Sequence, residues 1–255
     1  MNPETVMVLK VGGGEVDNPE YLKSLAKYIS AVDRRVVIVH GGGKDITRLL
    51  EKLGGEAKFH HGLRITDDAA IEVVEMVLSG LVNKRIVGAF VSMGVKALGL
   101  SGRDLALVRA KKLEAEVDLG HVGEPDHINS QFLRQIIDMG IVPVISPVSQ
   151  DSRGVVFNIN SDYIAAAVAV TLRAAELVFL SDVPSIYDRE LQISVLKISS
   201  IETLIASGVI GGGMIPKVRS AVNALKNGVK NVLITDLEGL ARYLRGEQAA
   251  TLITR

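Results

Sequence analysis

Lys10 is a charged residue inside an apolar run, residues 6–11, that leads directly into three consecutive glycines. Such a run, bounded by glycines, is typical of a strand buried on both faces of a parallel sheet. Ligands of these sheets bind beyond the carboxyl ends of the strands. A desolvated lysine at that place needs an anion, and a phosphate held by the glycine amides would supply one. A lysine that extends from the strand end into water is the alternative.

A second unusual lysine, Lys217, follows a glycine run and Pro216. Pro216 is expected to be the first residue of a helix, which makes Lys217 the second. A cation there opposes the helix dipole by about 0.3 to 1 kcal/mol, a cost that a solvated lysine tolerates. A bound phosphate would instead make the site favourable through amides, dipole and ammonium together. Lys10 and Lys217 are therefore candidates to stabilise a phosphoryl group in transfer.

The segment from Asn158 to Asp162 precedes an alanine-rich helix. Its Asn, Ser and Asp residues are ordinary helix caps in one interpretation. In the other, Asp162 lies between the two lysines and fixes their orientation. Asn158 comes too early to cap the helix, so its amide is free to bind a ligand.

A second glycine run, Gly41 to Gly43, follows another apolar strand and His40. The two glycine runs would flank one cleft, although each is also compatible with a simple strand-to-helix turn. Neither has the spacing of a dinucleotide fingerprint or a Walker loop, which disfavours Rossmann dehydrogenases and P-loop enzymes. Arg64 lies in an expected hairpin, residues 58–66, and offers a fork for a carboxylate or is an ordinary surface arginine.

The elements that must position these residues alternate along the chain. Five apolar runs predict buried strands at residues 6–11, 36–39, 141–145, 177–180 and 231–234. Helical patterns lie between them, at about residues 19–31, 44–53, 68–92, 130–139, 161–172, 199–207, 216–227 and 237–244. This alternation predicts an α/β fold, a three-layer αβα sandwich with a mainly parallel central sheet. The helix over residues 68–92 is apolar around more than half its circumference, which indicates a subunit interface or a central core helix.

Composition limits the class of protein. The 255 residues are 47% hydrophobic and 4% aromatic, as expected for one large α/β unit or two packed lobes with an aliphatic core. The formal net charge is zero, so the composition gives no sign of the positive charge that binding to nucleic acid or a membrane surface would need. A small-molecule partner is therefore expected. The absence of cysteine excludes disulfides and thiol chemistry, and the five histidines lack zinc-type spacing. No signal pattern or bilayer-spanning stretch is found, so a cytoplasmic location is expected.

Eight segments resemble, in the correct order, the motifs of the amino acid kinase family. They are Lys10–Gly13, Val39–Gly43, Gly62–Asp67, Val82–Lys84, Gly120–Gly123, Asn158–Asp162, Leu180–Pro184 and Gly213–Lys217. The resemblance covers about residues 6 to 235 and is greatest to members that act on N-acetyl-L-glutamate. It implies the amino acid kinase fold and transfer of the ATP γ-phosphoryl group to the side-chain carboxylate of that substrate, a step of arginine biosynthesis, with Mg²⁺ carried by ATP.

The same resemblance implies roles for individual residues. Lys10 and Lys217 would stabilise charge on the transferring group, and Asp162 would organise both. The acceptor would be bound by Gly42, Gly43, Arg64 and Asn158. The nucleotide and its phosphates would be bound by Gly12, Gly13, Asp182, Val183, Pro184, Ser185, Ile186, Tyr187, Val209, Ile210 and Gly211. Residues 1–173 would form an N-terminal lobe for acceptor binding and dimerisation, and residues 174–255 a C-terminal lobe for ATP.

The sequence also departs from the family pattern. Arg103 and Leu105 stand where lysine and glycine are usual, and the turns at residues 235–239 and 249–251 are atypical. Five residues precede the first strand, so we expect no N-terminal helix of the kind found in hexameric, arginine-inhibited members, and a homodimer insensitive to arginine. Two other functions remain open: a kinase of carrier-protein-bound aminoadipate in lysine biosynthesis, and a regulator that binds amino acids without catalysis.

Overall fold

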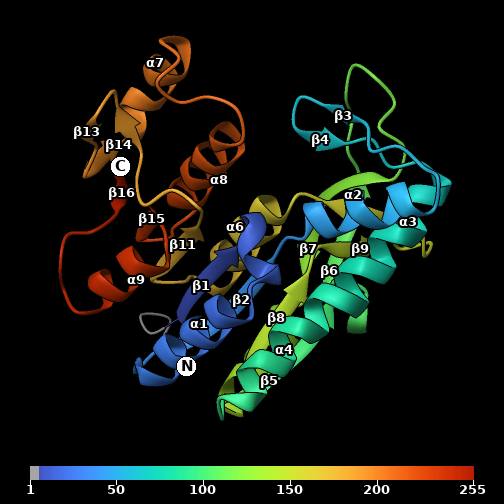
Figure 1. Cartoon of the computed structure of the whole chain (residues 1–255), viewed down its shortest axis with the longest axis horizontal. Helices are drawn as coiled ribbons and strands as arrows, with labels where there is room; N and C mark the ends of the chain where they lie inside the picture. The colour runs from blue at the N-terminus through green and yellow to red at the C-terminus, as the bar shows by residue number, and fades with distance from the viewer. Residues whose placement is uncertain (1–5) are drawn as a thin grey trace.

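A single eight-stranded sheet runs through both halves of the protein in the computed structural model, which describes residues 6–255 (Figure 1). The strand order is β14-β16-β15-β11-β1-β2-β8-β5, and every neighbouring pair is parallel except β15 and β16. Helices cover both faces of the sheet (Figure 1). The expected three-layer αβα sandwich with a mainly parallel sheet is thereby confirmed.

The five expected strands form the interior of this sheet. They are β1 (Val6–Val11), β2 (Arg35–His40), β8 (Val142–Ser146), β11 (Glu176–Leu180) and β15 (Asn231–Thr235). The sequence analysis missed three strands at or near the edges: β5 (Ala97–Ser101), β14 (Val195–Lys197) and β16 (Thr251–Thr254). They are short, and each has exposed or half-buried positions, so they lack the continuous apolar run that marks an interior parallel strand.

The helices follow the expected ranges closely. They are α1 (Pro19–Ala31), α2 (Gly43–Lys52), α3 (Asp68–Glu75), α4 (Asn83–Ser92), α5 (Ser130–Asp138), α6 (Ser161–Leu172), α7 (Ile201–Ala206), α8 (Met214–Lys226) and α9 (Leu237–Leu244). The helix expected over residues 68–92 is continuous in direction, but Met76–Val82 is a π-helical turn. Helix α8 begins two residues earlier than expected, so Pro216 is its third residue. Proline is still tolerated there, because no N–H in the first turn has a helical partner.

Both faces of strand β1 are buried, each against its own layer of helices. Val6 and Val8 belong to a core shared with α5, α6 and α8. Met7, Leu9 and Val11 belong to a second core shared with α1, α3, α4 and α9. This two-sided burial explains why the strand is apolar at every position except Lys10.

Two smaller units carry site residues above the sheet. A closed barrel consists of β6 (Val108–Lys112), β7 (Val122–Ile128), β9 (Val148–Gln150) and β10 (Val156–Ile159). The expected hairpin is confirmed as β3 (Phe59–His60) and β4 (Leu63–Arg64), turning at His61 and Gly62, which both have positive φ. A further hairpin joins β12 (Tyr187–Asp188) to β13 (Leu191–Gln192).

The chain passes from one half of the molecule to the other after α6. Arg173 ends that helix in a left-handed conformation, and the Ala175 N–H donates to the Val6 carbonyl, so β11 begins directly beside β1. The expectation about the segment before the first strand lies outside the described residues. Within residues 6–255, no helix has the length and apolar character needed to cross a bilayer.

Candidate active site

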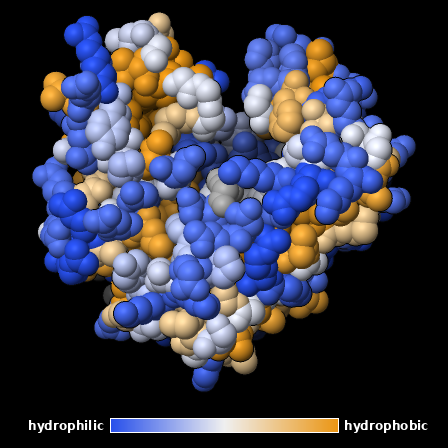
Figure 2. Space-filling view, viewed as in Figure 1, coloured by the Kyte–Doolittle hydropathy of each residue, from blue (hydrophilic) through white to orange (hydrophobic). Residues whose placement is uncertain are grey.

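A cleft of about 290 Å³ opens at the carboxyl ends of the central strands. Figure 2 shows it as the hollow between the β3–β4 hairpin on one side and the C-terminal half on the other. The structure brings seven of the proposed site residues to this cleft: Lys10, Gly42, Gly43, Arg64, Asn158, Asp162 and Lys217. Residues as far apart in the sequence as 10 and 217 therefore share one site.

A buried carboxylate lies between the two lysines. Lys10 Nζ is 2.9 Å from Asp162 Oδ1, and Lys217 Nζ is 3.5 Å from Asp162 Oδ2. The Lys10 contact is an ion pair rather than an aligned hydrogen bond, since Oδ1 accepts none within the described residues. Two cations against one carboxylate leave the cleft with an excess positive charge, which favours an anionic ligand.

Local structure fixes each member of this group. Lys10 is the penultimate residue of β1, and its ammonium folds back over Gly12, where a Cβ would overlap it. Asp162 lies in the first turn of α6, with its N–H bonded to the capping Asn160 side chain at 2.8 Å. A side chain at residue 12 would therefore displace the Lys10 ammonium from this position, a constraint that the sequence alone does not reveal.

Lys217 lies in the first turn of α8, and its ammonium also donates to the Gly213 carbonyl at 3.4 Å. Burial, followed by the positive charge of Lys10, lowers the pKa of Lys217 below its ordinary value, while Asp162 opposes this shift. A lysine held in this way gains from any additional negative charge in the cleft.

Arg64 lines the cleft and has one guanidinium nitrogen without a hydrogen-bond partner in the described chain. Its Nη2 donates to the Gly43 carbonyl at 2.9 Å and to Thr47 Oγ1 at 2.8 Å, and the guanidinium lies 4.7 Å from the centre of the Phe59 ring. Its Nη1 is buried and has no hydrogen-bond partner in the described chain. Burial lowers the pKa of Arg64, so the charge is partly desolvated. A ligand carboxylate would satisfy both the orphan nitrogen and the charge.

Asn158 reaches the cleft from strand β10 and is linked to Arg64. Its Nδ2 donates to Thr66 Oγ1 at 3.2 Å, and that hydroxyl donates in turn to the Arg64 carbonyl at 2.8 Å. This chain of bonds joins the barrel to the hairpin, so that an amide and a guanidinium approach the same ligand position.

The second glycine run is pressed against the π-helical turn. A Cβ on Gly42 would lie 2.7 Å from Leu78 Cδ2 and 3.1 Å from Val82 Cγ2, so no larger residue fits without a shift. Beneath the run, fully buried His40 contacts the Gly41 carbonyl through Nδ1 at 2.8 Å and the Asn83 amide through Nε2 at 3.2 Å. Burial lowers the pKa of His40 to about 4, so the ring is neutral at pH 7 and its Nδ1 is the donor.

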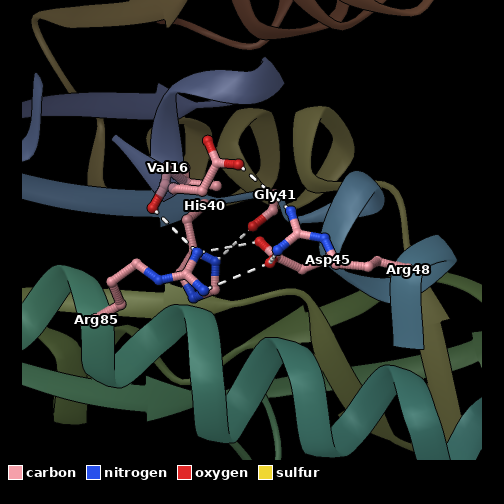
Figure 3. Close-up of polar contacts among 7 residues, drawn as sticks. Val16, His40, Gly41, Asp45, Arg48 and Arg85 are labelled. Atoms are coloured by element: carbon pink, nitrogen blue, oxygen red, sulfur yellow. Dashed lines mark hydrogen bonds and ion pairs between the residues drawn. The ribbon is translucent and has the colours of Figure 1, made fainter. Parts of the chain in front are cut away.

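A second buried carboxylate, Asp45 in the first turn of α2, forms ion pairs with Arg48 and Arg85 (Figure 3). Arg85 of α4 donates to Asp45 Oδ2 at 3.1 Å and to the Val16 carbonyl at 3.3 Å. Arg48 pairs with the same carboxylate at 3.5 Å. Sequence reasoning missed this network; its only local signal is an acidic residue two positions after the glycines, which also suits an ordinary first helical turn.

Of the residues expected to bind the nucleotide, 182–187 and 209–211 lie in the C-terminal half and outside the lining of this cleft. Gly12 instead follows β1 directly, beside Lys10. Asp182 is near enough to influence the pKa of Lys217. Ser185, Ile186 and Ile210 are buried, so their side chains support the segment and only their backbone atoms are available to a ligand. Val183 and Tyr187 are exposed. The cleft reaches this region through Gly212 and Gly213, next to Gly211.

Thr251 fixes the end of that segment and was not identified from the sequence. Its fully buried hydroxyl accepts the Ile186 N–H at 2.8 Å and donates to the Ile193 carbonyl at 2.7 Å. No group of three or more His, Cys, Asp or Glu side chains within residues 6–255 is arranged to hold a metal ion.

Comparison with known proteins gives concordant matches. The model of the amino acid kinase family matches residues 5–236. An acetylglutamate kinase of Chloroflexus aurantiacus is 43% identical over 249 residues, covering 95% of this chain and 98% of that protein. One from Archaeoglobus fulgidus is 42% identical over 248 residues, with 91% and 86% covered. The crystal structure of smu.665 from Streptococcus mutans superposes with a TM-score of 0.85 at 30% identity, covering 98% of both chains.

Proposed function

Because this chain belongs to the amino acid kinase family, we propose that it transfers the γ-phosphoryl group of ATP to the side-chain carboxylate of N-acetyl-L-glutamate. The observation that carries the proposal is the buried Lys10–Asp162–Lys217 group, which shares a cleft with the orphan nitrogen of Arg64. The names of relatives with more than 40% identity over most of the chain agree with it. The reaction belongs to arginine biosynthesis.

The acceptor needs no general base. A glutamate side chain has an ordinary pKa of about 4.3, so at pH 7 it is already an ionised nucleophile. Attack forms a bond from a carboxylate oxygen to the γ-phosphorus and breaks the bond to the bridging oxygen, which leaves with ADP. Catalysis then depends on in-line positioning and on stabilising charge that spreads over the phosphoryl oxygens.

The two lysines are the groups suited to that stabilisation. Lys10 extends from β1 and Lys217 from α8, so they approach the phosphoryl group from different elements of the fold. Asp162 forms an ion pair with each lysine, which would hold the ammonium groups in place before the substrates bind. Preorganised charges of this kind need little rearrangement in the transition state.

The acceptor side of the proposal rests on Arg64, Asn158 and the second glycine run. Arg64 Nη1 would pair with the α-carboxylate of the substrate, because it is buried and lacks a partner within the described chain. The Asn158 amide would bond to the acyl-amide or carboxyl groups. Gly42 and Gly43 would offer backbone N–H groups without side chains in the way.

The nucleotide side rests on the C-terminal half and on the first glycine run. Residues 182–187 and 209–211 would bind ATP mainly through backbone atoms, with Tyr187 as an exposed ring. Gly12 and Gly13 would approach the phosphates beside Lys10. Mg²⁺ would arrive with ATP, and the proposed location is the cytoplasm. We also propose that residues 1–173 form the acceptor lobe and residues 174–255 the nucleotide lobe.

A homodimer is the proposed assembly. Met76, Leu81 and Val91 of the π-helical turn and α4 are about half exposed, although they belong to the helical segment that the sequence marks as unusually apolar. Burying them against a second copy would remove apolar surface from water. Light scattering of the wild type should report twice the chain mass, and Leu81→Glu should shift it to the monomer; a monomeric wild type would contradict this assembly.

The activity is tested with ATP and a panel of acceptors while ADP release is measured. We expect turnover with N-acetyl-L-glutamate and none with N-acetyl-L-aspartate, which is one methylene too short to reach the phosphoryl group from the Arg64 anchor. Arg64→Lys should raise the KM for the acceptor and leave the KM for ATP unchanged, since lysine cannot form the fork. If calorimetry shows that both substrates bind but N-acetyl-L-glutamate is not turned over, the protein is a non-catalytic regulator. Turnover only with carrier-bound aminoadipate would favour the lysine-pathway kinase.

A further inference from the structure

A second groove, of about 340 Å³, lies between helices α6 and α8 and shares no lining residue with the cleft. Tyr163 and Ala167 line it from α6, and Arg219 and Ser220 line it from α8. Strand β7 closes its remaining side with Glu124 and Pro125. The groove is therefore formed by three elements of the fold rather than by one loop.

Ser220 contributes to the groove wall a buried hydroxyl that lacks a hydrogen-bond partner within the described residues. The residue is only 4% exposed, and its Oγ has no hydrogen-bond partner among residues 6–255. A buried hydroxyl without a partner is unfavourable, and serine in the middle of a helix commonly bonds to a backbone carbonyl of the preceding turn instead. Ser220 lines the groove, so a rotation of its side chain that exposes Oγ would let an acceptor atom of a ligand there supply the missing bond.

Among the charged side chains that line the groove, only the positive charge of Arg219 is unpaired within the described residues. Arg219 is exposed and forms no ion pair within the described part of the chain. Glu124 lies across from it, but its carboxylate is 3.0 Å from Lys111 Nζ and is already paired. The unpaired charge of Arg219 is thus the one available to a ligand.

Two further donors face the same space. Tyr163 is half-buried, and no hydrogen bond of its hydroxyl is found within residues 6–255. Burial, followed by the charge of Asp162, raises its pKa, and Arg219 opposes that shift, so the phenol stays protonated near the guanidinium. Asn223 accepts from Asn227 through Oδ1, which leaves its amide hydrogens free. The groove offers hydroxyl, amide and guanidinium donors together.

We propose that this groove is a binding site for a small organic carboxylate. The carboxylate would pair with Arg219 and accept from Ser220 Oγ and Tyr163 Oη. Its short apolar body would lie against Pro125, Ala166 and Ala167. A purely inorganic anion would leave this apolar wall exposed to water, which is why an organic acid is the better occupant.

The site would connect the two helices that carry the reaction. Tyr163 follows Asp162 directly, and Arg219 is two residues beyond Lys217. A ligand that touches both would bridge α6 and α8 on surfaces that the substrates do not use. The inference concerns binding in this groove and is independent of which acceptor the cleft takes.

Amide NMR spectra of the full chain, titrated with butyrate and separately with inorganic phosphate, test the proposal. We expect saturable butyrate shifts at Ala166, Ala167 and Asn223. Arg219→Gln should weaken butyrate binding by about tenfold or more, since it removes a charge-assisted hydrogen bond. Ser220→Ala should weaken it by about threefold to tenfold while the protein remains folded.

The matched control is Lys226→Gln, which removes one exposed positive charge from the same helix but outside the groove. It should leave butyrate affinity unchanged. Shifts confined to Gly42 and Gly43 would mean that butyrate enters only the cleft, and would overturn the proposal. So would equal affinity in Arg219→Gln and wild type, absence of saturable shifts, or a response to phosphate alone.

Discussion

Lys10 Nζ lies 2.9 Å from Asp162 Oδ1, in a pair whose two side chains are 7% and 5% exposed. The pair joins the first central strand to a helix that begins 150 residues later, and it orients one of two cations toward a common cleft. Its burial means that neither charge is screened by solvent as a surface pair is. The proposed reaction would depend on this relationship, because the lysine would have to be in place before the phosphoryl group moves.

Lys10→Ala should lower kcat by about two to three orders of magnitude, the range found when one preorganised charge-stabilising donor is removed. The KM values should change much less, since the lost interaction is strongest in the transition state. Steady-state kinetics with both substrates measure this. Lys23→Ala, which removes an exposed lysine paired with Glu20, is the control and should be neutral. A large increase in KM with unchanged kcat would assign Lys10 to ground-state binding.

Lys217→Arg should change the alkaline side of the pH–rate profile. Because the pKa of Lys217 is lowered, the free enzyme loses this charge at a lower pH than an ordinary lysine would, so kcat/KM falls as pH rises toward that value. Arginine remains charged throughout. Each enzyme's kcat/KM, normalised to its own value at pH 7.5, should therefore decline in the wild type and stay level in the variant. Parallel profiles would show that another group controls the alkaline limb.

Thr251→Val should raise the KM for ATP by about tenfold and leave the KM for the acceptor unchanged. The substitution keeps the volume of the side chain but removes the hydroxyl that accepts the Ile186 N–H and donates to the Ile193 carbonyl. Residues 182–187 then lose their anchor. Thr251→Ser retains the hydroxyl and should restore the wild-type KM for ATP. If both KM values rose together, Thr251 would support the fold as a whole rather than the nucleotide segment.

His40 should make the protein less stable in acid. Its pKa is lowered from 6.5 to about 4 by burial, so below pH 6.5 the unfolded chain binds a proton that the folded protein does not. Stability is thus highest above pH 6.5 and falls as the pH decreases toward 4. Between pH 7.5 and pH 5 this single group should account for about 2 kcal/mol.

Urea unfolding of wild type and His40→Asn at both pH values isolates that contribution. The variant should lose about 2 kcal/mol less than the wild type on acidification, whatever its stability at pH 7.5. His127→Gln removes an exposed histidine and should follow the wild type. An identical acid loss in His40→Asn would mean that His40 is protonated in the folded protein.

The local patterns identified most of the sheet and the helices because each interior strand is covered on both faces. Val6 to Leu9 and Val36 to Val39 are uninterrupted apolar runs for that reason. The edge strand β14, its neighbour β16 and the four-stranded barrel escaped detection, since exposed or half-buried positions interrupt their apolar residues. The π-helical turn at Met76–Val82 likewise has no local signature, although its Leu78 and Val82 lie against Gly42.

By itself, the sequence determined that this protein is an α/β sandwich whose strand ends place lysines, glycines and carboxylates where an anion can bind. A charge inside an apolar run is informative because burial makes it costly unless something compensates it. Only the tertiary structure decided which groups compensate which: that Asp162 serves both lysines, that Arg64 keeps one nitrogen unpaired, and that Arg85 pairs with Asp45 of α2 and bonds to the Val16 carbonyl. Distances of 3 Å between residues far apart in the chain depend on how the layers pack, and no local pattern encodes that.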